Sequence, residues 1–242
     1  MNKGNKTEVT EQLHRYNRNV RICHWINVVA FCYLVVSGIH IFLDFPELYW
    51  GKVGFQGHDA VFKLSDWGIS WDEAGAMGNR RWGRNYHFLF AWVSVINGTI
   101  YVCWNLWNKH FHKNLFPGRN ELTRESLKTD LVEHMRLRAP EGASVGRYSG
   151  LQKISYLIVI FILSPFMILS GLAQMPAFTA ISPELIDLFG GRQTARTLHV
   201  ICMLWMILFL VVHVVEVFVG GAVNEIRSMI TGKYAVPKEH AE

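Results

Sequence analysis

Residues 197–215 read TLHVICMLWMILFLVVHVV and contain no Asp, Glu, Lys or Arg. As a helix, this run extends over about 28 Å, close to the ~30 Å hydrocarbon core of a bilayer. Three further runs share this absence of charge, at residues 22–43, 85–108 and 154–183. A soluble fold of 242 residues would have too little amphipathic sequence to cover four such helices, so the runs predict a membrane protein.

The composition agrees with a folded membrane protein. Half of the residues are hydrophobic and only 18% are charged, which excludes a mainly disordered chain. The third run exceeds one span, so we expect it to cross the membrane over residues 154–174 and to leave it afterwards. The predicted fold is an all-α, integral membrane four-helix bundle in one domain, residues 1–242, with spans near 22–43, 85–108, 154–174 and 197–219.

The distribution of Lys and Arg predicts the orientation. Residues 1–21, the loop 109–153 and the tail from Arg227 together hold 17 of the 24 basic residues. Basic residues concentrate on the cytoplasmic side of a membrane protein, so both termini are expected in the cytoplasm. The first run is longer than a signal-peptide core, and no small-x-small cleavage site follows it, so we expect a retained helix.

The two long loops differ in character. Residues 44–84, on the expected outer side, hold six acids, seven glycines and four tryptophans, which indicates an ordered cap. The inner loop is predicted to contain a helix with Thr123 as N-cap, because apolar residues follow Thr123 at near-helical spacing.

The sequence lacks the motifs of several common metal, redox and nucleotide sites. The four cysteines show no C-x-x-C spacing, and Cys23-His24 lacks the first cysteine of a covalent haem attachment motif. We interpret all four as small core residues. A P-loop, a GxGxxG motif and a nucleophile elbow are also absent, and no nucleic-acid partner is expected, because topology accounts for the basic residues.

Histidine is the residue type that indicates a function. Five of the 11 histidines fall in the spans: His24, His40, His87, His199 and His213. Ionisable residues inside a bilayer are functional candidates. For an isolated one, the alternative is an imidazole that only hydrogen-bonds a neighbouring carbonyl.

The spacing of the histidines indicates two sites. His199 and His213 are 14 residues apart, which places them about 40° apart around a helix and about 21 Å apart along it. His87 opens the second run at the outer level of His199. His24 opens the first run at the inner level of His213. Matching the levels therefore pairs His87 with His199 and His24 with His213.

Two facing neutral imidazoles are suited to a haem. They supply the axial ligands of a six-coordinate haem iron. Zinc and copper usually take three or four protein ligands, which one pair does not provide. Small residues in the spans would leave room for the flat macrocycle, namely Gly38, Gly98, Ser170 and Gly171. The prediction is one haem between the two histidines of each pair.

His40 competes with His87 for the outer level. It lies 16 residues from His24, about 160° around the helix, so the two cannot face the same interior stripe. We interpret His40 as an interfacial or hydrogen-bonding residue. The remaining histidines lie in tails or loops and are not expected to be ligands: His14, His58, His110, His112, His134 and His240.

Four motifs carry a resemblance beyond this spacing. They are RxxHW at 21–25, RRWxRxxH at 80–87, GGRQTARTLH at 190–199 and NEIRSMITGKY at 224–234. With them, nearly the whole chain resembles the four-helix cytochrome b subunits of bacterial respiratory oxidoreductases. That group includes formate dehydrogenase gamma subunits, nickel-iron hydrogenase b-type cytochromes and thiosulfate-reductase-type cytochrome b subunits.

The resemblance implies a function and a ligand set. Two b haems would take their ligands from His24, His87, His199 and His213, in a bacterial cytoplasmic membrane. The chain would carry electrons between quinone, as an exchangeable carrier, and an oxidoreductase docked outside, with no catalytic residues of its own. The partner would be a molybdopterin or nickel-iron enzyme, reached directly or through an iron-sulfur or c-type cytochrome carrier.

Haem propionates need compensating charge near the membrane surface. Arg21, Arg84 and Arg196 lie within one or two turns of the histidines and are candidates for this binding. The alternative role of these arginines is topological anchoring. The quinone site is expected near the inner loop after Asn108.

Two other classes of function stay open. One is a haem-free membrane anchor, and the other is a proton-coupled transporter in which His213 relays protons with Glu216, three residues further along. A reduced-minus-oxidised optical spectrum separates both classes from a cytochrome.

Overall fold

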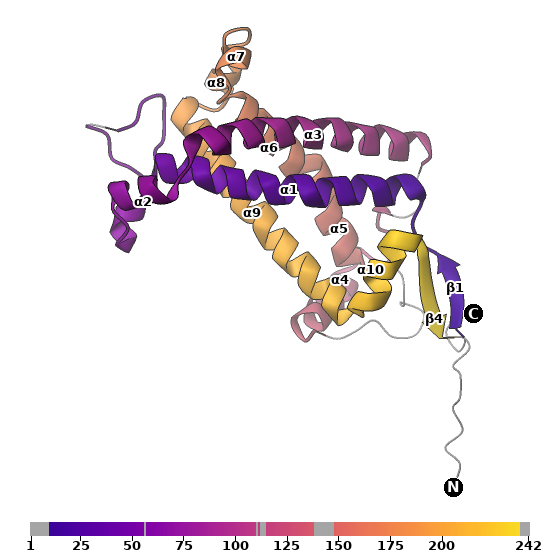
Figure 1. Cartoon of the computed structure of the whole chain (residues 1–242). Coiled ribbons are helices and arrows are strands. Elements are labelled where there is room, and N and C mark those ends of the chain that lie inside the picture. The colour runs from indigo at the N-terminus through magenta and orange to yellow at the C-terminus, as the bar shows by residue number, and fades with distance from the viewer. Residues whose placement is uncertain (1–9, 56, 110, 112–114, 138–147, 238–242) are drawn as a thin grey trace. The chain divides into compact units, whose positions relative to one another are not determined.

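The computed structural model describes residues 10–237 apart from 56, 110, 112–114 and 138–147. Within these residues the chain is mostly helical (Figure 1), and four helical segments are long and apolar enough to cross a membrane. They are Arg18–Asp44, Arg80–Trp107, Gly150–Leu172 and Arg192–Val219. The predicted all-α membrane helical bundle is thus confirmed.

Three of the four segments are single helices. They are α1 (Arg18–Asp44), α3 (Arg80–Trp107) and α9 (Arg192–Val219). Each begins four or five residues before the corresponding predicted span. The predicted limits exclude charged residues, whereas the helical backbone hydrogen bonding continues through the arginines that precede each uncharged run.

The third segment changes its helical form. It consists of α5 (Gly150–Ile158), the π-helix η4 (Val159–Leu163) and α6 (Ser164–Leu172). Pro165 has no N–H, so the α-helical hydrogen bond to the carbonyl of residue 161 cannot form, and a wider turn accommodates the break. In this turn the Val159 carbonyl accepts hydrogen bonds from the Ser164 amide and from the Ser164 hydroxyl, the latter at 2.7 Å.

The long segments expose most of their apolar surface. Only 6–11% of the most apolar window of each segment is buried within the chain. Ile96 on α3 and Leu208 on α9 are each more than half exposed. Apolar surface of this extent is suited to contact with lipid.

The chain divides into two units, which are described separately. The first comprises residues 1–24, 101–157 and 209–242, and the second comprises residues 25–100 and 158–208. Each long helical segment therefore contributes one end to each unit.

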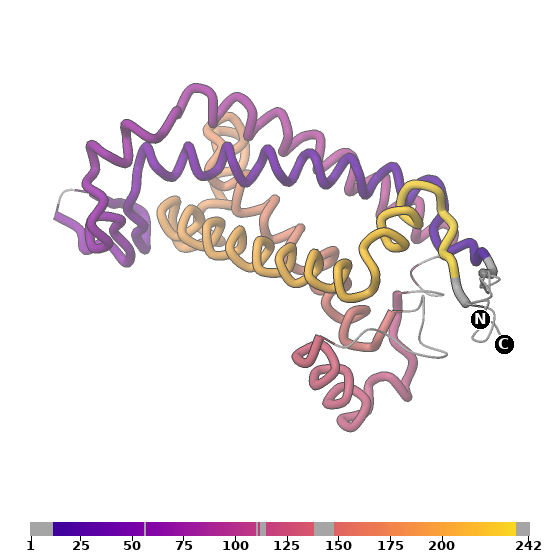
Figure 2. The backbone as a smooth tube through the Cα atoms, turned by 60° about the horizontal axis from the view of Figure 1, so that its bottom comes forward, coloured from indigo at the N-terminus to yellow at the C-terminus, as the bar shows by residue number. Residues whose placement is uncertain are grey.

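The first unit joins the two ends of the described chain. Strand β1 (Thr10–His14) pairs antiparallel with β4 (Lys233–Pro237). In Figure 2 the indigo and yellow ends of the described tube lie close together. Two helices complete this unit, α4 (Arg124–Met135) and α10 (Ala222–Thr231). As predicted, Thr123 caps α4, and its hydroxyl accepts a hydrogen bond from the Ser126 amide at 3.3 Å.

The second unit contains short elements beside the long helices. The segment between α1 and α3 forms β2 (Glu47–Leu48), β3 (Phe62–Lys63), the 3-10 helix η1 (Leu64–Trp67) and α2 (Trp71–Met77). The segment before α9 forms α7 (Pro176–Thr179) and α8 (Glu184–Leu188). Strands β2 and β3 pair antiparallel. Ser70 and Glu73 form a capping box that fixes the start of α2.

Candidate functional site

Two pairs of histidines face each other, one pair in each unit. In the second unit, the ring centroids of His87 on α3 and His199 on α9 are 6.2 Å apart, and the ring planes meet at 63°. In the first unit, the ring centroids of His24 on α1 and His213 on α9 are 6.4 Å apart, at 61°. The structure brings together both pairs predicted from spacing, with nearly the same geometry.

This geometry fits a metal ion held between two imidazoles. A bond from a metal to an imidazole nitrogen is about 2.0–2.1 Å long, and the nitrogen lies about 1.1 Å from its ring centroid, so a shared ion separates two centroids by about 6.3 Å. In the part of the chain that the structure describes, no group of three or more His, Cys, Asp or Glu side chains is placed to hold a metal ion. Two imidazoles suffice for a haem iron, since the macrocycle supplies the other four ligands.

A Ser-Gly dipeptide of α1 packs against the His87 ring. The Ser37 hydroxyl lies 3.1 Å from His87 Nδ1, and Ser37 is fully buried. A Cβ atom added at Gly38 would lie 3.4 Å from Cε1 of the same ring. The dipeptide therefore leaves the ring little freedom to rotate.

A second Ser-Gly dipeptide, on α6, packs against His199 in the same way. The Ser170 hydroxyl lies 2.9 Å from His199 Nδ1 and is also fully buried. A Cβ atom at Gly171 would lie 3.3 Å from His199 Cε1. A Cβ atom at Gly98, by contrast, would meet nothing within 4 Å. Among these small residues, those of the two dipeptides lie against the imidazoles themselves.

Aromatic side chains surround His213 in the first unit. The Phe209 ring stacks on the imidazole with a centroid distance of 5.9 Å, and the Tyr156 ring meets it edge-on at 6.2 Å. The Nδ1 atom of His213 is buried and has no hydrogen-bond partner among the described residues. The two histidine pairs thus share their spacing but differ in what supports the rings.

The candidate propionate-binding arginines occupy different settings. Arg21 donates a hydrogen bond to the Ile230 carbonyl on α10. Arg196 donates to the carbonyl oxygen of Glu47 at 2.8 Å, and also to that of Phe45. Arg84 is exposed.

His40 lies away from both histidine pairs in its contacts. Its ring meets the Trp82 ring edge-on, with centroids 5.2 Å apart. This contact lies within the second unit, and His40 Nδ1 is buried with no hydrogen-bond partner among the described residues.

The motif GGRQTARTLH fastens the segment between α1 and α3 to the start of α9. Gly191 has φ of 129°, and a Cβ atom there would overlap the Gly51 carbonyl. The Thr194 hydroxyl accepts a hydrogen bond from the Gly51 amide at 2.7 Å, and the Thr197 hydroxyl donates to the Tyr49 carbonyl at 2.7 Å. The motif therefore holds the residues near 50 against the start of α9, the helix that also carries His199.

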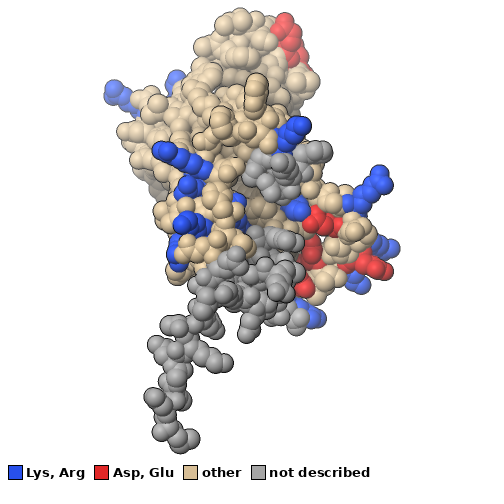
Figure 3. Space-filling view, turned by 90° about the vertical axis from the view of Figure 1, so that its right-hand side faces the viewer, with Lys and Arg blue, Asp and Glu red and all other residues tan. Residues whose placement is uncertain are grey.

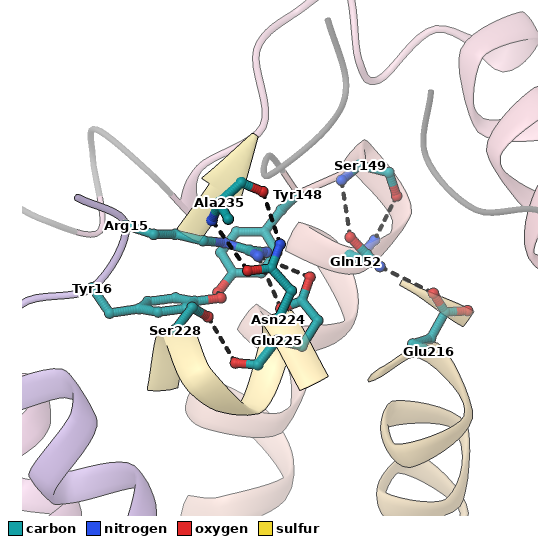
Figure 4. A network of polar contacts seen from close by, with 10 residues as sticks. All are labelled: Arg15, Tyr16, Tyr148, Ser149, Gln152, Glu216, Asn224, Glu225, Ser228 and Ala235. Carbon is teal, nitrogen blue, oxygen red and sulfur yellow. Dashed lines mark hydrogen bonds and ion pairs between the residues drawn. The ribbon is translucent and has the colours of Figure 1, made fainter. Parts of the chain in front are cut away.

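A polar network occupies the first unit (Figure 4). Arg15 Nη1 donates to both carboxylate oxygens of Glu225 at 2.8 Å, and its guanidinium lies over the rings of Tyr16, Tyr148 and Tyr234. The Tyr148 hydroxyl donates to the Tyr16 hydroxyl at 2.8 Å. Burial raises the pKa of Tyr16 to about 12, so this phenol stays neutral at ordinary pH.

Glu216 joins α9 to two neighbouring elements of the same unit. Its carboxylate accepts a hydrogen bond from Gln152 Nε2 at 3.1 Å, and it lies 3.5 Å from His134 Nε2. These are the contacts of the residue that the transporter hypothesis pairs with His213.

Comparison with known proteins identifies the family. The model of the family described as prokaryotic cytochrome b561 matches residues 15–232. The chain belongs to this family. It is therefore a membrane b-type cytochrome of electron transfer, a multi-pass protein of the prokaryotic cytoplasmic membrane, and haem b is its cofactor.

Two curated relatives of this cytochrome span nearly its whole length. One, from Azospira oryzae, is named as the protein-methionine-sulfoxide reductase subunit YedZ1 and is 28% identical over 82% of this chain and 87% of its own. The other, from Cupriavidus necator, is named as a Ni/Fe-hydrogenase B-type cytochrome subunit and is 24% identical over 90% of this chain and 84% of its own. The resemblance to cytochrome b subunits of oxidoreductases is thus confirmed. No solved structure matches the cytochrome significantly.

Sequence reasoning missed the contact between Ser37 and His87. The sequence identifies Ser170 only as a small residue, whereas in the structure its hydroxyl faces His199. The available signal was the repetition of Ser-Gly after an apolar residue in the first and third spans, at 37–38 and 170–171.

Proposed function

We propose that this cytochrome holds two haem b groups, one between His24 and His213 and one between His87 and His199. The repeated geometry supports this proposal most directly, since both pairs have nearly the same ring spacing and angle. One helix, α9, supplies a histidine to each pair, with the two histidines about 21 Å apart along its axis.

The residues around each pair hold the imidazoles and exclude water. A bound haem supplies one-electron chemistry at its iron. At the His24 and His213 pair, Phe209 and Tyr156 provide aromatic walls. At the other pair, the two Ser-Gly dipeptides fix the rings. Ligands held in this way move little between oxidation states, which favours rapid electron transfer.

The proposed orientation places both termini in the cytoplasm. It rests on the excess of Lys and Arg in the segments that the first unit contains, and Figure 3 shows basic side chains on the face that carries β1 and β4. The pair His24 and His213 is then the inner pair, and His87 with His199 is the outer pair. The inner loop after Asn108 is the proposed region for quinone, whose reduction to quinol takes up two electrons and two protons.

The proposed partner is a catalytic oxidoreductase docked on the outer side. Both relatives are named as subunits, one of a methionine-sulfoxide reductase and one of a Ni/Fe hydrogenase. In this cytochrome, Trp67 is 76% exposed and Trp50 is 50% exposed, beside the acids of residues 44–84. Exposed aromatics among charges are typical of a protein interface. A molybdopterin or nickel-iron enzyme, with or without an iron-sulfur or c-type carrier, is the proposed class.

The arginines near the pairs are proposed to bind propionates. Arg84 is exposed and has its guanidinium available at the start of α3. Arg21 and Arg196 each donate hydrogen bonds to backbone carbonyls, but a guanidinium has five N–H donors. Each therefore retains donors for a carboxylate.

Haem counting in histidine variants tests the proposal. The purified wild type is expected to hold two haems per chain, with a b-type reduced-minus-oxidised spectrum. His87→Ala or His199→Ala should remove only the outer haem, and His24→Ala or His213→Ala only the inner one. His40→Ala is the matched control and should keep both. Loss of a haem in His40→Ala with retention in His87→Ala would overturn the outer pair, and a colourless folded protein would overturn haem binding altogether.

A further inference from the structure

The two serines beside the outer pair, Ser37 and Ser170, donate their hydroxyl hydrogens to backbone carbonyls. The Ser37 hydroxyl donates to the Tyr33 carbonyl at 2.5 Å, one turn earlier on α1. The Ser170 hydroxyl donates to the Met167 carbonyl at 3.1 Å on α6. A hydroxyl has one proton and two lone pairs, so each serine faces its histidine as an acceptor.

This arrangement fits rings that carry their proton on Nδ1. An acceptor at Nδ1 requires an Nδ1–H group, so the Nε2 atoms of His87 and His199 carry the lone pairs. A ring in this tautomer presents Nε2 as its ligand atom.

We propose that Ser37 and Ser170 are positioning residues that lower the reduction potential of the outer haem and fix the angle between its two imidazoles. The inference rests on the proposed function, because it needs a haem between His87 and His199. A hydrogen bond from Nδ1–H makes a ligating imidazole more electron-donating, which stabilises ferric over ferrous iron. Because each serine also donates to a carbonyl, its oxygen is polarised into a better acceptor.

The inner pair provides a reference within the same molecule. His213 Nδ1 has no hydrogen-bond partner among the described residues, so no serine acts on that ligand. Removing the two hydroxyls should therefore change the outer haem and leave the inner haem as it was.

Redox titration of serine variants tests this role without measuring enzyme activity. Ser37→Ala and Ser170→Ala each remove one oxygen atom and leave the histidines intact. At a fixed applied potential, each should raise the ratio of ferrous to ferric outer haem about threefold, and the double variant about tenfold. At about 59 mV per decade for one electron, the double variant shifts the potential upward by about 59 mV. The His213→Ala background isolates the outer haem for this titration.

Ser164→Ala is the matched control. Ser164 lies on the same helix as Ser170, and its hydroxyl also donates to a backbone carbonyl, that of Val159, at 2.7 Å. Unlike Ser170, it has no hydrogen bond to a histidine among the described residues. This variant should leave both potentials unchanged. Low-spin ferric electron paramagnetic resonance gives a second measure, because the signal depends on the angle between the imidazole planes, 63° here. It should change in Ser37→Ala and Ser170→Ala only.

The outcomes separate this inference from the proposed function. Two haems with an outer potential that stays constant in the double variant, or that moves together with the inner one, would overturn the inference alone. If an alanine variant loses the outer haem, Ser170→Thr and Ser37→Thr retain the hydroxyl and should keep both the haem and its potential; loss there too overturns the inference. Absence of an outer haem from the wild type overturns the proposed function instead.

Discussion

Gly171 lies directly against His199, since a Cβ atom at position 171 would stand 3.3 Å from Cε1 of the imidazole. Gly38 has the same relationship to His87, at 3.4 Å. The separation at Gly171 is tighter than ordinary carbon contacts and that at Gly38 lies at their limit, so a methyl group would press on the ring, more strongly at Gly171. The rotation of each outer ligand is therefore set by the absence of a side chain on a neighbouring helix.

Gly171→Ala and Gly38→Ala should lower the occupancy of the outer haem severalfold, because the displaced imidazole no longer points its Nε2 atom at the iron. The ratio of haem to protein in purified samples, with the inner haem as reference, measures this loss. Gly98→Ala is the control, since its Cβ atom meets nothing within 4 Å. Equal occupancy in all three variants would contradict the packing described for the outer pair.

Glu225→Gln should destabilise the protein by about 1–3 kcal/mol, because it leaves the partly buried Arg15 guanidinium without its charged partner. The side chains of Arg15 and Glu225 are only 12% and 19% exposed. In the pair Lys52 and Asp187 the side chains are 73% and 68% exposed. Asp187→Asn should therefore change stability by less than about 0.5 kcal/mol. Thermal unfolding in one detergent compares the two, and similar melting temperatures would contradict this difference.

Acid should weaken the contact between Glu121 and Lys153. The hydrogen bond from Lys153 holds the pKa of Glu121 below its usual 4.5. A carboxyl with a lowered pKa stabilises the fold above its unfolded pKa, and this contribution is lost as the pH falls through the folded pKa. Glu121→Gln should thus melt earlier than wild type at neutral pH, and the difference should shrink as the pH is lowered and Glu121 takes up its proton. A difference that stays constant with pH would show that Glu121 acts through packing alone.

Reporter fusions should distinguish the two faces of the membrane. A reporter joined after Glu242 should be active only if it functions in the cytoplasm, and one inserted between Gly54 and Gly78 only if it functions outside. The reverse pattern would exchange the levels of the two haems. It would also move the search for the quinone site to the segment between α1 and α3.

Much of this architecture could be predicted from sequence, because lipid imposes long uncharged helices. The pairing of His199 with His87 and of His213 with His24 followed from helical rise and rotation. The same reasoning placed the N-cap of α4 at Thr123. These features depend on local geometry or on the height of a residue in the membrane.

Other features depend on which helices are neighbours and how each is rotated. The hydrogen bonds of Ser37 and Ser170 to histidines on other helices are of this kind. So are the donation from Arg196 to the Glu47 carbonyl and the pairing of β1 with β4. A hydropathy pattern does not predict how one helix is rotated relative to its neighbour. None of these contacts leaves a periodic signal in the sequence.

The ladder between β1 and β4 also constrains the order of assembly. Its strands pair His14 with Lys233, and the nearby partners Arg15 and Glu225 are 210 residues apart in sequence. A ribosome makes the chain from its N-terminus, so β1 waits without its partner while all four membrane segments are synthesised. An unpaired strand is open to wrong pairings during this interval. Closure of the ladder therefore follows the synthesis of all four segments, and protection of β1 from proteolysis reports that β4 has been made and has paired.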